Sequence, residues 1–214
     1  GYVSVEASGC MLDVAVAPAS GNPGDRLVLT LSGCPSHATP SGDFVDAVMD
    51  PNYPIVVIEH GEQGSQQHNA TELEIVRPLI ECALAMRLDG VDGVGIVVPH
   101  RAQKALLRTH FPQLAEVQSI DTVERFQGGE RDVIIVSATA SDPGYVLAEA
   151  DFLLNLNRLN VALSRPRKKL IVVASQSVTR LLVSDLDVFD NAVIWKRLYF
   201  QYANEVIWEG IIAG

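Results

Sequence analysis

The chain has 214 residues, 48% of them hydrophobic and 20% charged, which is ordinary for a globular protein and enough for one large domain or two small ones. Its formal net charge of −10 argues against a surface given over to nucleic-acid phosphates, but a local basic site on an acidic body is compatible with that charge. The chain has no long apolar stretch, no signal-peptide pattern and no Cys/His cluster, so we expect no membrane contact, no metal site and a reducing cytoplasmic setting, or a nuclear one in a eukaryote.

The chain divides at about residue 43. Residues 1–43 are predicted to be an N-terminal segment of short strands with no assigned role, and residues 44–214 to form one domain. The predicted strands of that domain are residues 54–60, 94–99, 115–120, 133–136 and 168–175. The predicted helices are residues 70–88, 100–111, 152–165, 177–186 and 191–210. This alternation favours an α/β fold with a mostly parallel sheet covered on both faces, in which ligands bind at the carboxyl ends of the strands.

The first long helix has a recognisable start. Asn69 can cap it, and Glu72 lies three residues later, which makes a pair resembling a capping box. Leu73, Val76 and Ile80 then recur at helical spacing. We therefore expect both polar side chains to bond to the backbone of the first turn.

Pro99, His100 and Gln103 follow the second predicted strand of this domain, in the sequence VVPHRAQ. His100 can stack on a ligand or donate a hydrogen bond to it, or it can cap the next helix or pack inside the protein. Gln103 is expected to brace the domain rather than bind a ligand.

The loop before the fourth predicted strand is polar, although the strand itself is apolar enough to be buried on both faces. Gly128 and Gly129 let the backbone approach a ligand closely. Glu130 carries a carboxylate that accepts hydrogen bonds, and Thr122 carries a hydroxyl group, so the loop is equipped to hold a ligand. The alternative is a buried structural loop in which Glu124, Arg125 and Arg131 make local ion pairs. Asp132 is expected to cap or brace the loop rather than touch a ligand.

Arg158 and Arg165 are seven residues apart in a predicted helix, which is about two turns, so both project from one face. Pro166 ends or kinks the helix directly afterwards. Two guanidinium groups in this arrangement suit a polyphosphate, because each offers a planar fork of donors that stays charged. Two solvated surface arginines are the alternative interpretation.

Three segments, Val94–Leu107, Asp121–Thr139 and Arg158–Val173, occur in this order and together resemble motifs IV, V and VI of superfamily 1 nucleic-acid helicases, in the group of the RNA-surveillance and DNA-replication helicases. The resemblance covers roughly residues 54–175. It implies a RecA-like (P-loop NTPase-like) three-layer sandwich without its own Walker A sequence. Such a domain is the second, C-terminal RecA-like domain of a motor.

The resemblance also implies a role for each motif. Arg165 would be the arginine finger on the γ-phosphate of ATP held by the neighbouring domain, and Glu130 would bind the nucleotide ribose. Further nucleotide contacts are implied for Arg158, Gln127, Gly128 and Gly129. Contacts with single-stranded DNA or RNA are implied for Thr122, Pro99 and His100.

The sequence differs from the family pattern at two places and lacks the sequences that bind phosphate and Mg²⁺. Val98 and His100 replace the Thr and Tyr of motif IV, and residues 29–44 contain no arginine where the family has a YRMHP-like segment. Neither a G-x-x-x-x-G-K-[ST] loop nor a DExx carboxylate pair occurs in the sequence. ATP with Mg²⁺ would therefore be bound mainly by the first RecA-like domain of the same polypeptide, and this chain alone would not hydrolyse ATP.

The alternative function is a degenerate, non-catalytic RecA-like module for protein or nucleic-acid binding, which both departures would fit. Its docking face would be the aromatic C-terminal segment, which is also compatible with simple core packing. The aromatic residues concerned are Trp195, Tyr199, Phe200, Tyr202 and Trp208.

Overall fold

A computed structural model of the chain describes most of the predicted domain and three short segments before it. The described residues are 2–7, 10–15, 26–33, 42–51, 53–86, 93–123, 126, 130–153, 155, 162, 164–181, 195 and 206–211. Among them, no helix is both long enough and apolar enough to cross a bilayer.

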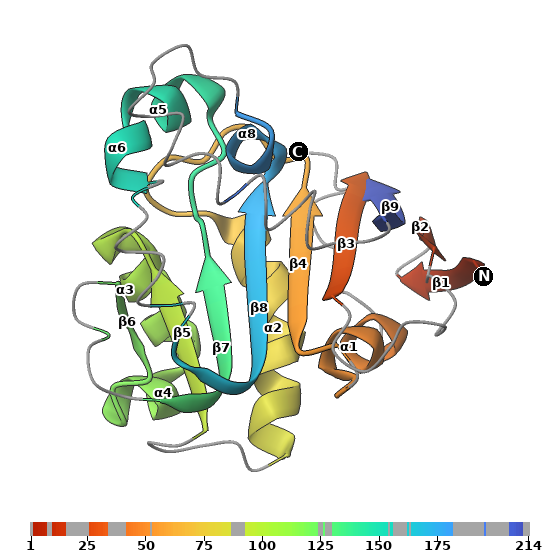
Figure 1. Cartoon of the computed structure of the whole chain (residues 1–214), viewed down its shortest axis with the longest axis horizontal. Coiled ribbons are helices and arrows are strands. Elements are labelled where there is room, and N and C mark those ends of the chain that lie inside the picture. The colour runs from red at the N-terminus through yellow and green to blue at the C-terminus, as the bar shows by residue number, and fades with distance from the viewer. Residues whose placement is uncertain are drawn as a thin grey trace.

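The described strands form a seven-stranded sheet in the order β6-β5-β7-β8-β4-β3-β9, in which each pair of neighbours is parallel (Figure 1). A separate antiparallel pair lies beside it, made of β1 Tyr2–Ala7 and β2 Cys10–Ala15. The strands of the large sheet are β3 Arg26–Gly33, β4 Ile55–His60, β5 Val94–Val98, β6 Ile120–Thr122, β7 Arg131–Ser137, β8 Pro166–Ser175 and β9 Val206–Ile211.

Helices cover both faces of the sheet and complete three layers. They are α1 Gly42–Met49, α2 Ala70–Ala85, α3 Arg101–His110, α4 Pro112–Glu116, α5 Pro143–Ala148, α6 Ala150–Leu153 and α8 Gln176–Thr179. Successive residues of one strand point to opposite hydrophobic clusters: Val56 and Ile58 pack with α1 to α4, whereas Val57 packs with α5, α6 and Trp195. This alternation is the expected result of burying a parallel sheet on both faces, and it confirms the predicted α/β sandwich.

The apolar, β-branched runs were predicted well as strands. β4, β5, β7 and β8 lie where the sequence predicts them, with ends that differ by a few residues. The short strands predicted within residues 1–43 are also present, and the last of them, β3, joins the large sheet beside β4. The proposed domain boundary at residue 43 stays a prediction. Strand β3 of the large sheet lies before this boundary in the sequence.

Two predicted elements are wrong. Residues 115–120 were expected to be a strand, but Pro112 starts the short helix α4, Gln118 turns the chain with φ 54°, and β6 begins only at Ile120. The helix expected at residues 191–210 is wrong at its end, because Val206–Ile211 is strand β9, parallel to β3. Within 191–205 the structure describes only Trp195, which is helical. Its β-branched and aromatic residues suit a strand when a sheet edge is available to pair with.

Four helices differ from the prediction or are only partly described. The sequence reading missed α1 and α5. For the helices predicted at 152–165 and 177–186, the described parts are limited mainly to α6 and α8, and the remainder, including Arg158, lies outside the described residues.

The polar loop before β7 is attached to β5 by an aromatic ring. The Phe126 ring packs directly over Gly95 in β5: a Cβ added at Gly95 would lie 2.4 Å from Phe126 Cζ and 2.9 Å from Ile134 Cδ1. The Arg131 guanidinium lies over the same Phe126 ring, 5.3 Å from the ring centroid. A glycine is therefore needed at position 95 because the loop approaches β5 closely, and not because the backbone adopts a special conformation there.

We expect Gly95→Ala to destabilise the chain by about 1–3 kcal/mol, because the added methyl must displace a buried ring and a core isoleucine. Urea denaturation followed by circular dichroism measures this change. Gly61→Ala is the matched control, since a Cβ at Gly61 meets nothing within 4 Å. Equal denaturation midpoints for the two variants would show that the Phe126 contact does not limit the size of residue 95.

Candidate functional site

The parallel strands give the sheet two chemically different ends, and the predicted site residues divide between them. Thr122 and Pro99 lie at the carboxyl ends of β6 and β5, with His100 next in the chain. Glu130 and Arg165 lie instead at the amino ends of β7 and β8, directly before each strand. Glu130 and Arg165 therefore do not lie at the carboxyl ends of the strands, where ligands were expected to bind.

The amino end brings Glu130 and Arg165 close together. The Arg131 N–H donates to the Arg165 carbonyl at 3.1 Å, and Arg131 is paired in register with Pro166. Glu130 is exposed and Arg165 is half-buried. The Arg165 Nε atom is buried and has no hydrogen-bond acceptor among the described residues. Of the nucleotide contacts implied by the motifs, Arg158, Gln127, Gly128 and Gly129 lie outside the described residues.

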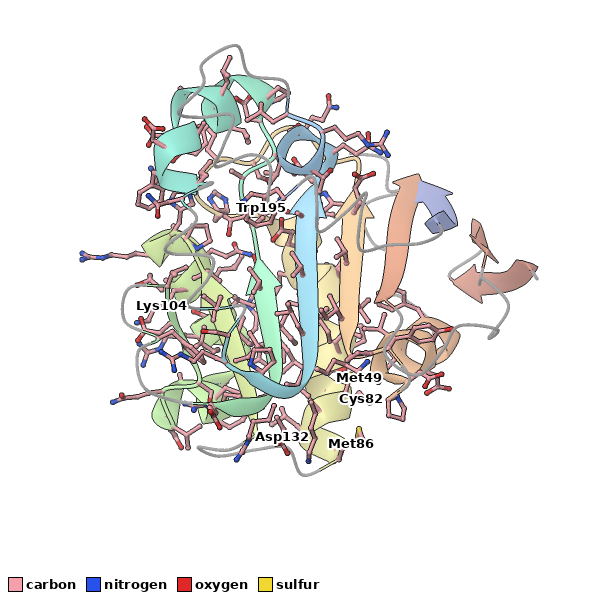
Figure 2. All side chains as sticks on the ribbon, in the orientation of Figure 1. Met49, Cys82, Met86, Lys104, Asp132 and Trp195 are labelled. Atoms are coloured by element: carbon pink, nitrogen blue, oxygen red, sulfur yellow. The ribbon has the colours of Figure 1, made fainter. Side chains whose placement is uncertain are left out.

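Most other charges at the amino end hold the strands together. Asp132 pairs with Arg167 at 3.2 Å and with Lys168 at 2.7 Å, so it braces β7 against β8, whereas the sequence predicted a cap or brace of the preceding loop. Figure 2 shows Asp132 at this end of the sheet, opposite to Trp195. Arg131 is buried and its Nη1 donates to the Glu130 carbonyl at 3.0 Å. The basic run therefore contributes structural contacts as well as the guanidinium of Arg165.

Lys169 is a buried member of the same basic run. Its Nζ donates to the carbonyl of Asp50 at 2.8 Å and to the carbonyl of Tyr53, and thereby ties β8 to the chain between α1 and β4. Burial lowers the pKa of Lys169 to about 8, and the nearby Asp50 carboxylate opposes this effect only in part.

The buried lysine predicts a pH dependence of stability. The ordinary lysine pKa is 10.5, so between about pH 8 and 10.5 the unfolded chain binds more protons than the folded chain. The free energy of unfolding is then expected to rise with pH in this window, by up to about 1.4 kcal/mol per pH unit from this group. Denaturation of the wild type and of Lys169→Met at several pH values measures the difference, and parallel pH profiles for the two proteins would contradict it.

At the carboxyl end, the carboxyl group of Glu72 is the centre of a buried hydrogen-bond network. It accepts from the Thr139 N–H at 3.0 Å and from the Ser137 hydroxyl at 2.5 Å, and His60 Nε2 lies 3.1 Å from it. Glu72 and its three partners are fully buried. Thr139 has φ 68°, which is costly for a β-branched residue and is compensated here by the bonds of its N–H and hydroxyl.

The network extends to the helices on either side. The Asn69 side chain accepts from the Glu72 N–H at 2.9 Å, which confirms the predicted cap. The reciprocal half of the capping box is wrong: the Asn69 N–H donates to the Gln103 side chain at 2.8 Å, and Glu72 turns into the core. Gln103 also donates to the Ser137 hydroxyl at 3.2 Å, so it braces α2, α3 and β7 as predicted.

We expect Glu72→Ala to destabilise the chain by about 3–5 kcal/mol, because it leaves several buried donors without an acceptor. Glu74→Ala, two positions away on α2, is the control. The Glu74 side chain is 41% exposed and, among the described residues, pairs with Arg77, so its loss should cost about 1 kcal/mol or less. Thermal and urea denaturation of both variants measure these costs, and equal losses would rule out Glu72 as the centre of the network.

The half-buried ring of His100 packs against two aromatic side chains. Its ring is stacked on Phe152 with centroids 5.4 Å apart, and it meets Tyr145 at 5.9 Å. It begins α3 without a side-chain cap bond. Pro99 lines a cavity of about 30 Å³ near it, together with Trp195. Of the two interpretations of His100, these contacts favour the packed histidine.

Thr122 lies in a groove that the sequence reading missed. Thr122 is the last residue of the edge strand β6, and an open hollow of about 310 Å³ beside it is lined also by Arg101, Lys104, Arg108, Ala105 and Asp121. The sequence does contain a signal for this groove, because three cations occupy positions i, i+3 and i+7 of one predicted helix. Among the described residues, no group of acidic, histidine or cysteine side chains is arranged to hold a metal ion.

Comparison with known proteins identifies relatives of the chain. The sequence profile of a family described as "AAA domain" matches residues 31–177. The chain is 34% identical over 114 residues to the DNA polymerase alpha-associated DNA helicase A of Saccharomyces cerevisiae, covering 52% of the chain and 16% of the relative. It is 30% identical over 140 residues to the DNA replication ATP-dependent helicase/nuclease dna2 of Schizosaccharomyces pombe, covering 63% and 10%.

A third relative is named for RNA. The chain is 38% identical over 86 residues to the probable RNA helicase armi of Drosophila melanogaster, covering 38% of the chain and 7% of the relative. The chain thus spans 16% or less of the length of each of these three proteins.

Proposed function

The chain belongs to the AAA-domain family and is a superfamily 1 helicase-type domain, and on that basis we propose that it is the C-terminal motor domain of an ATP-dependent helicase or translocase. In this proposal it supplies an arginine finger to an ATPase cleft and contacts to a single strand of DNA or RNA. The cleft is completed by the first RecA-like domain of the same polypeptide.

The observation that carries the proposal is the pairing of Arg165 with the start of β7. A single backbone hydrogen bond, from Arg131 to Arg165, keeps the guanidinium-bearing residue next to Glu130. These are the residues that motifs VI and V would direct to one nucleotide, although 35 positions separate them in the sequence. The half-buried Arg165 side chain bonds to no described residue, which is compatible with donation by its guanidinium to a phosphate.

The chemistry of each residue follows from its groups. Arg165 would stabilise the negative charge that develops on the transferred phosphoryl group, and the exposed Glu130 carboxylate would accept from the ribose hydroxyls. The 214 residues contain no phosphate-binding loop and no DExx pair, so the grip on the phosphates and the Mg²⁺ ligands would come from the first RecA-like domain. The isolated chain is then expected to be inactive.

The nucleic-acid strand would lie at the carboxyl end of the sheet. Thr122 would contact a phosphate there, and Pro99 and the first turn of α3 would lie beside it. Because the His100 ring is packed on Phe152 and Tyr145, we propose that His100 positions this turn rather than stacking on a base.

Strand β7 would couple the two ligands. Its amino end begins beside Glu130 and Arg165, and its carboxyl end enters the network of Glu72. A buried strand held at both ends moves as a rigid unit, so closure on ATP at one end would shift the strand-binding residues at the other.

The test is Arg165→Ala in the intact protein. We expect the ATP turnover rate to fall by about 10³-fold or more, with the affinity for an ATP analogue changed only severalfold. Arg167→Ala is the matched control: this arginine lies two residues away and pairs with Asp132, so its loss should leave turnover near that of the wild type. Turnover of Arg165→Ala within tenfold of the wild type would contradict the finger role.

A degenerate module that does not hydrolyse ATP is the second candidate. The internal packing of His100 and the change to Val98 favour it, because both remove side chains that the motif IV pattern offers to a ligand. Trp195 does not support a docking face, since it is buried in the hydrophobic core; the side chains of Tyr199, Phe200, Tyr202 and Trp208 lie outside the described residues. An intact protein without ATPase activity would favour this module.

A further inference from the structure

A basic groove runs along the outer side of α3 at the β6 edge of the sheet. Arg101, Lys104 and Arg108 lie on one face of α3, and Asp121 and Thr122 form the opposite wall. Arg101 and Arg108 are exposed, and Lys104 is half-buried; Figure 2 labels Lys104 on this side of the molecule. The groove is open and measures about 310 Å³.

The charges of the groove are arranged to attract an anion. Three cations face one carboxylate, although the whole chain has a net charge of −10. Lys104 Nζ lies 2.6 Å from Asp121 Oδ1, which also accepts from the Thr122 N–H at 2.7 Å, so the carboxylate is already engaged. Arg101 makes no hydrogen bond or ion pair with a described residue, and Arg108 donates one bond, at 3.3 Å, to the Ala115 carbonyl. The two arginines therefore retain donors for a ligand.

The spacing of the cations suits a chain of phosphates. Seven residues of helix separate the first cation from the last, a rise of about 10 Å. A row of three cations over this length is suited to consecutive phosphates of one strand. The described lining contains no aromatic side chain on which a base would stack. Contacts in this groove would therefore be to the backbone and independent of sequence.

We propose that this groove is a phosphate-binding track for single-stranded nucleic acid, which continues from Thr122 along α3. The inference rests on the proposed function, because Thr122 joins the groove to the strand-binding end of the sheet. Asp121 lowers the affinity of the track for a strand, because it neutralises Lys104 and places a negative charge beside the strand. The carboxylate thereby keeps binding weak enough for a strand to slide.

The experiment measures the affinity of the full-length protein for fluorescent oligo(dT) and oligo(U) by anisotropy, over a range of salt concentrations. Removing two phosphate contacts with the double variant R101Q/R108Q should reduce the slope of log K against log salt by about 1.4 and weaken binding on the order of tenfold. Asp121→Asn should increase the slope and strengthen binding, because it frees Lys104 while the asparagine amide oxygen still accepts from the Thr122 N–H. Arg77→Gln, which changes a half-buried arginine of α2 outside the groove, should match the wild type.

The gain of affinity in Asp121→Asn separates a binding track from a merely structural face, since a misfolded protein does not bind more tightly. An unchanged salt slope in R101Q/R108Q, or unchanged or weaker binding by Asp121→Asn, would overturn the inference. Loss of poly-glutamate binding in the double variant, with the nucleic-acid slope unchanged, would identify an acidic peptide as the occupant and also overturn it.

The proposed function can fail separately. If the wild type binds no oligonucleotide, both proposals fail. If the wild type binds and Arg165→Ala loses turnover while the double variant keeps the wild-type slope, only the track is wrong.

Discussion

A carboxyl group with no access to water is the constraint on which the carboxyl end of this domain depends. Glu72 is fully buried, and a buried polar group of this kind is tolerated only when donors surround it. The donors come from different parts of the chain: Thr139 and Ser137 at the end of β7, and His60 at the end of β4. Satisfying one side chain therefore fixes the relative positions of two strands and the first turn of α2.

The same network determines where motif IV lies. Gln103 bonds both to the Asn69 backbone and to Ser137, so α3 is fastened to the helix that carries Glu72 and to the strand that Glu72 holds. The basic face of α3 and the end of β6 are positioned as a consequence. A functional surface on a helix needs such support, because small displacements of phosphate-binding side chains weaken contacts that depend on geometry.

The two candidate interfaces lie at opposite ends of the sheet, and β7 runs between them. At its amino end the strand is held by Asp132, by the Phe126 and Arg131 contact on β5, and by the bond to Arg165. At its carboxyl end it is held by Glu72. An apolar strand buried on both faces has little freedom to deform, so a change at one end is transmitted as displacement of the whole element. This arrangement is suited to coupling a nucleotide to a nucleic-acid strand.

The secondary structure could be read from the sequence wherever the local pattern agrees with the tertiary context. The β-branched runs of β4, β5, β7 and β8, and the cap at Asn69, are local signals of this kind. Helix α4 replaced an expected strand because Pro112 also favours a helix start, and β9 replaced an expected helix because β3 offers an edge for pairing. Strand pairing joins residues far apart in the chain, and a local pattern contains no information about an available edge.

The sequence by itself determined the class of the fold, the order of three motifs and the chemical groups that they contain. Only the tertiary structure decided at which end of the sheet those groups lie, that Glu72 turns inward instead of closing its own helix cap, and that Lys104 meets Asp121 in one groove. The physical reason is that residue type and spacing specify what a side chain can bond to within a few positions. Which distant donor or acceptor completes the bond depends on how strands pair and how helices pack across them.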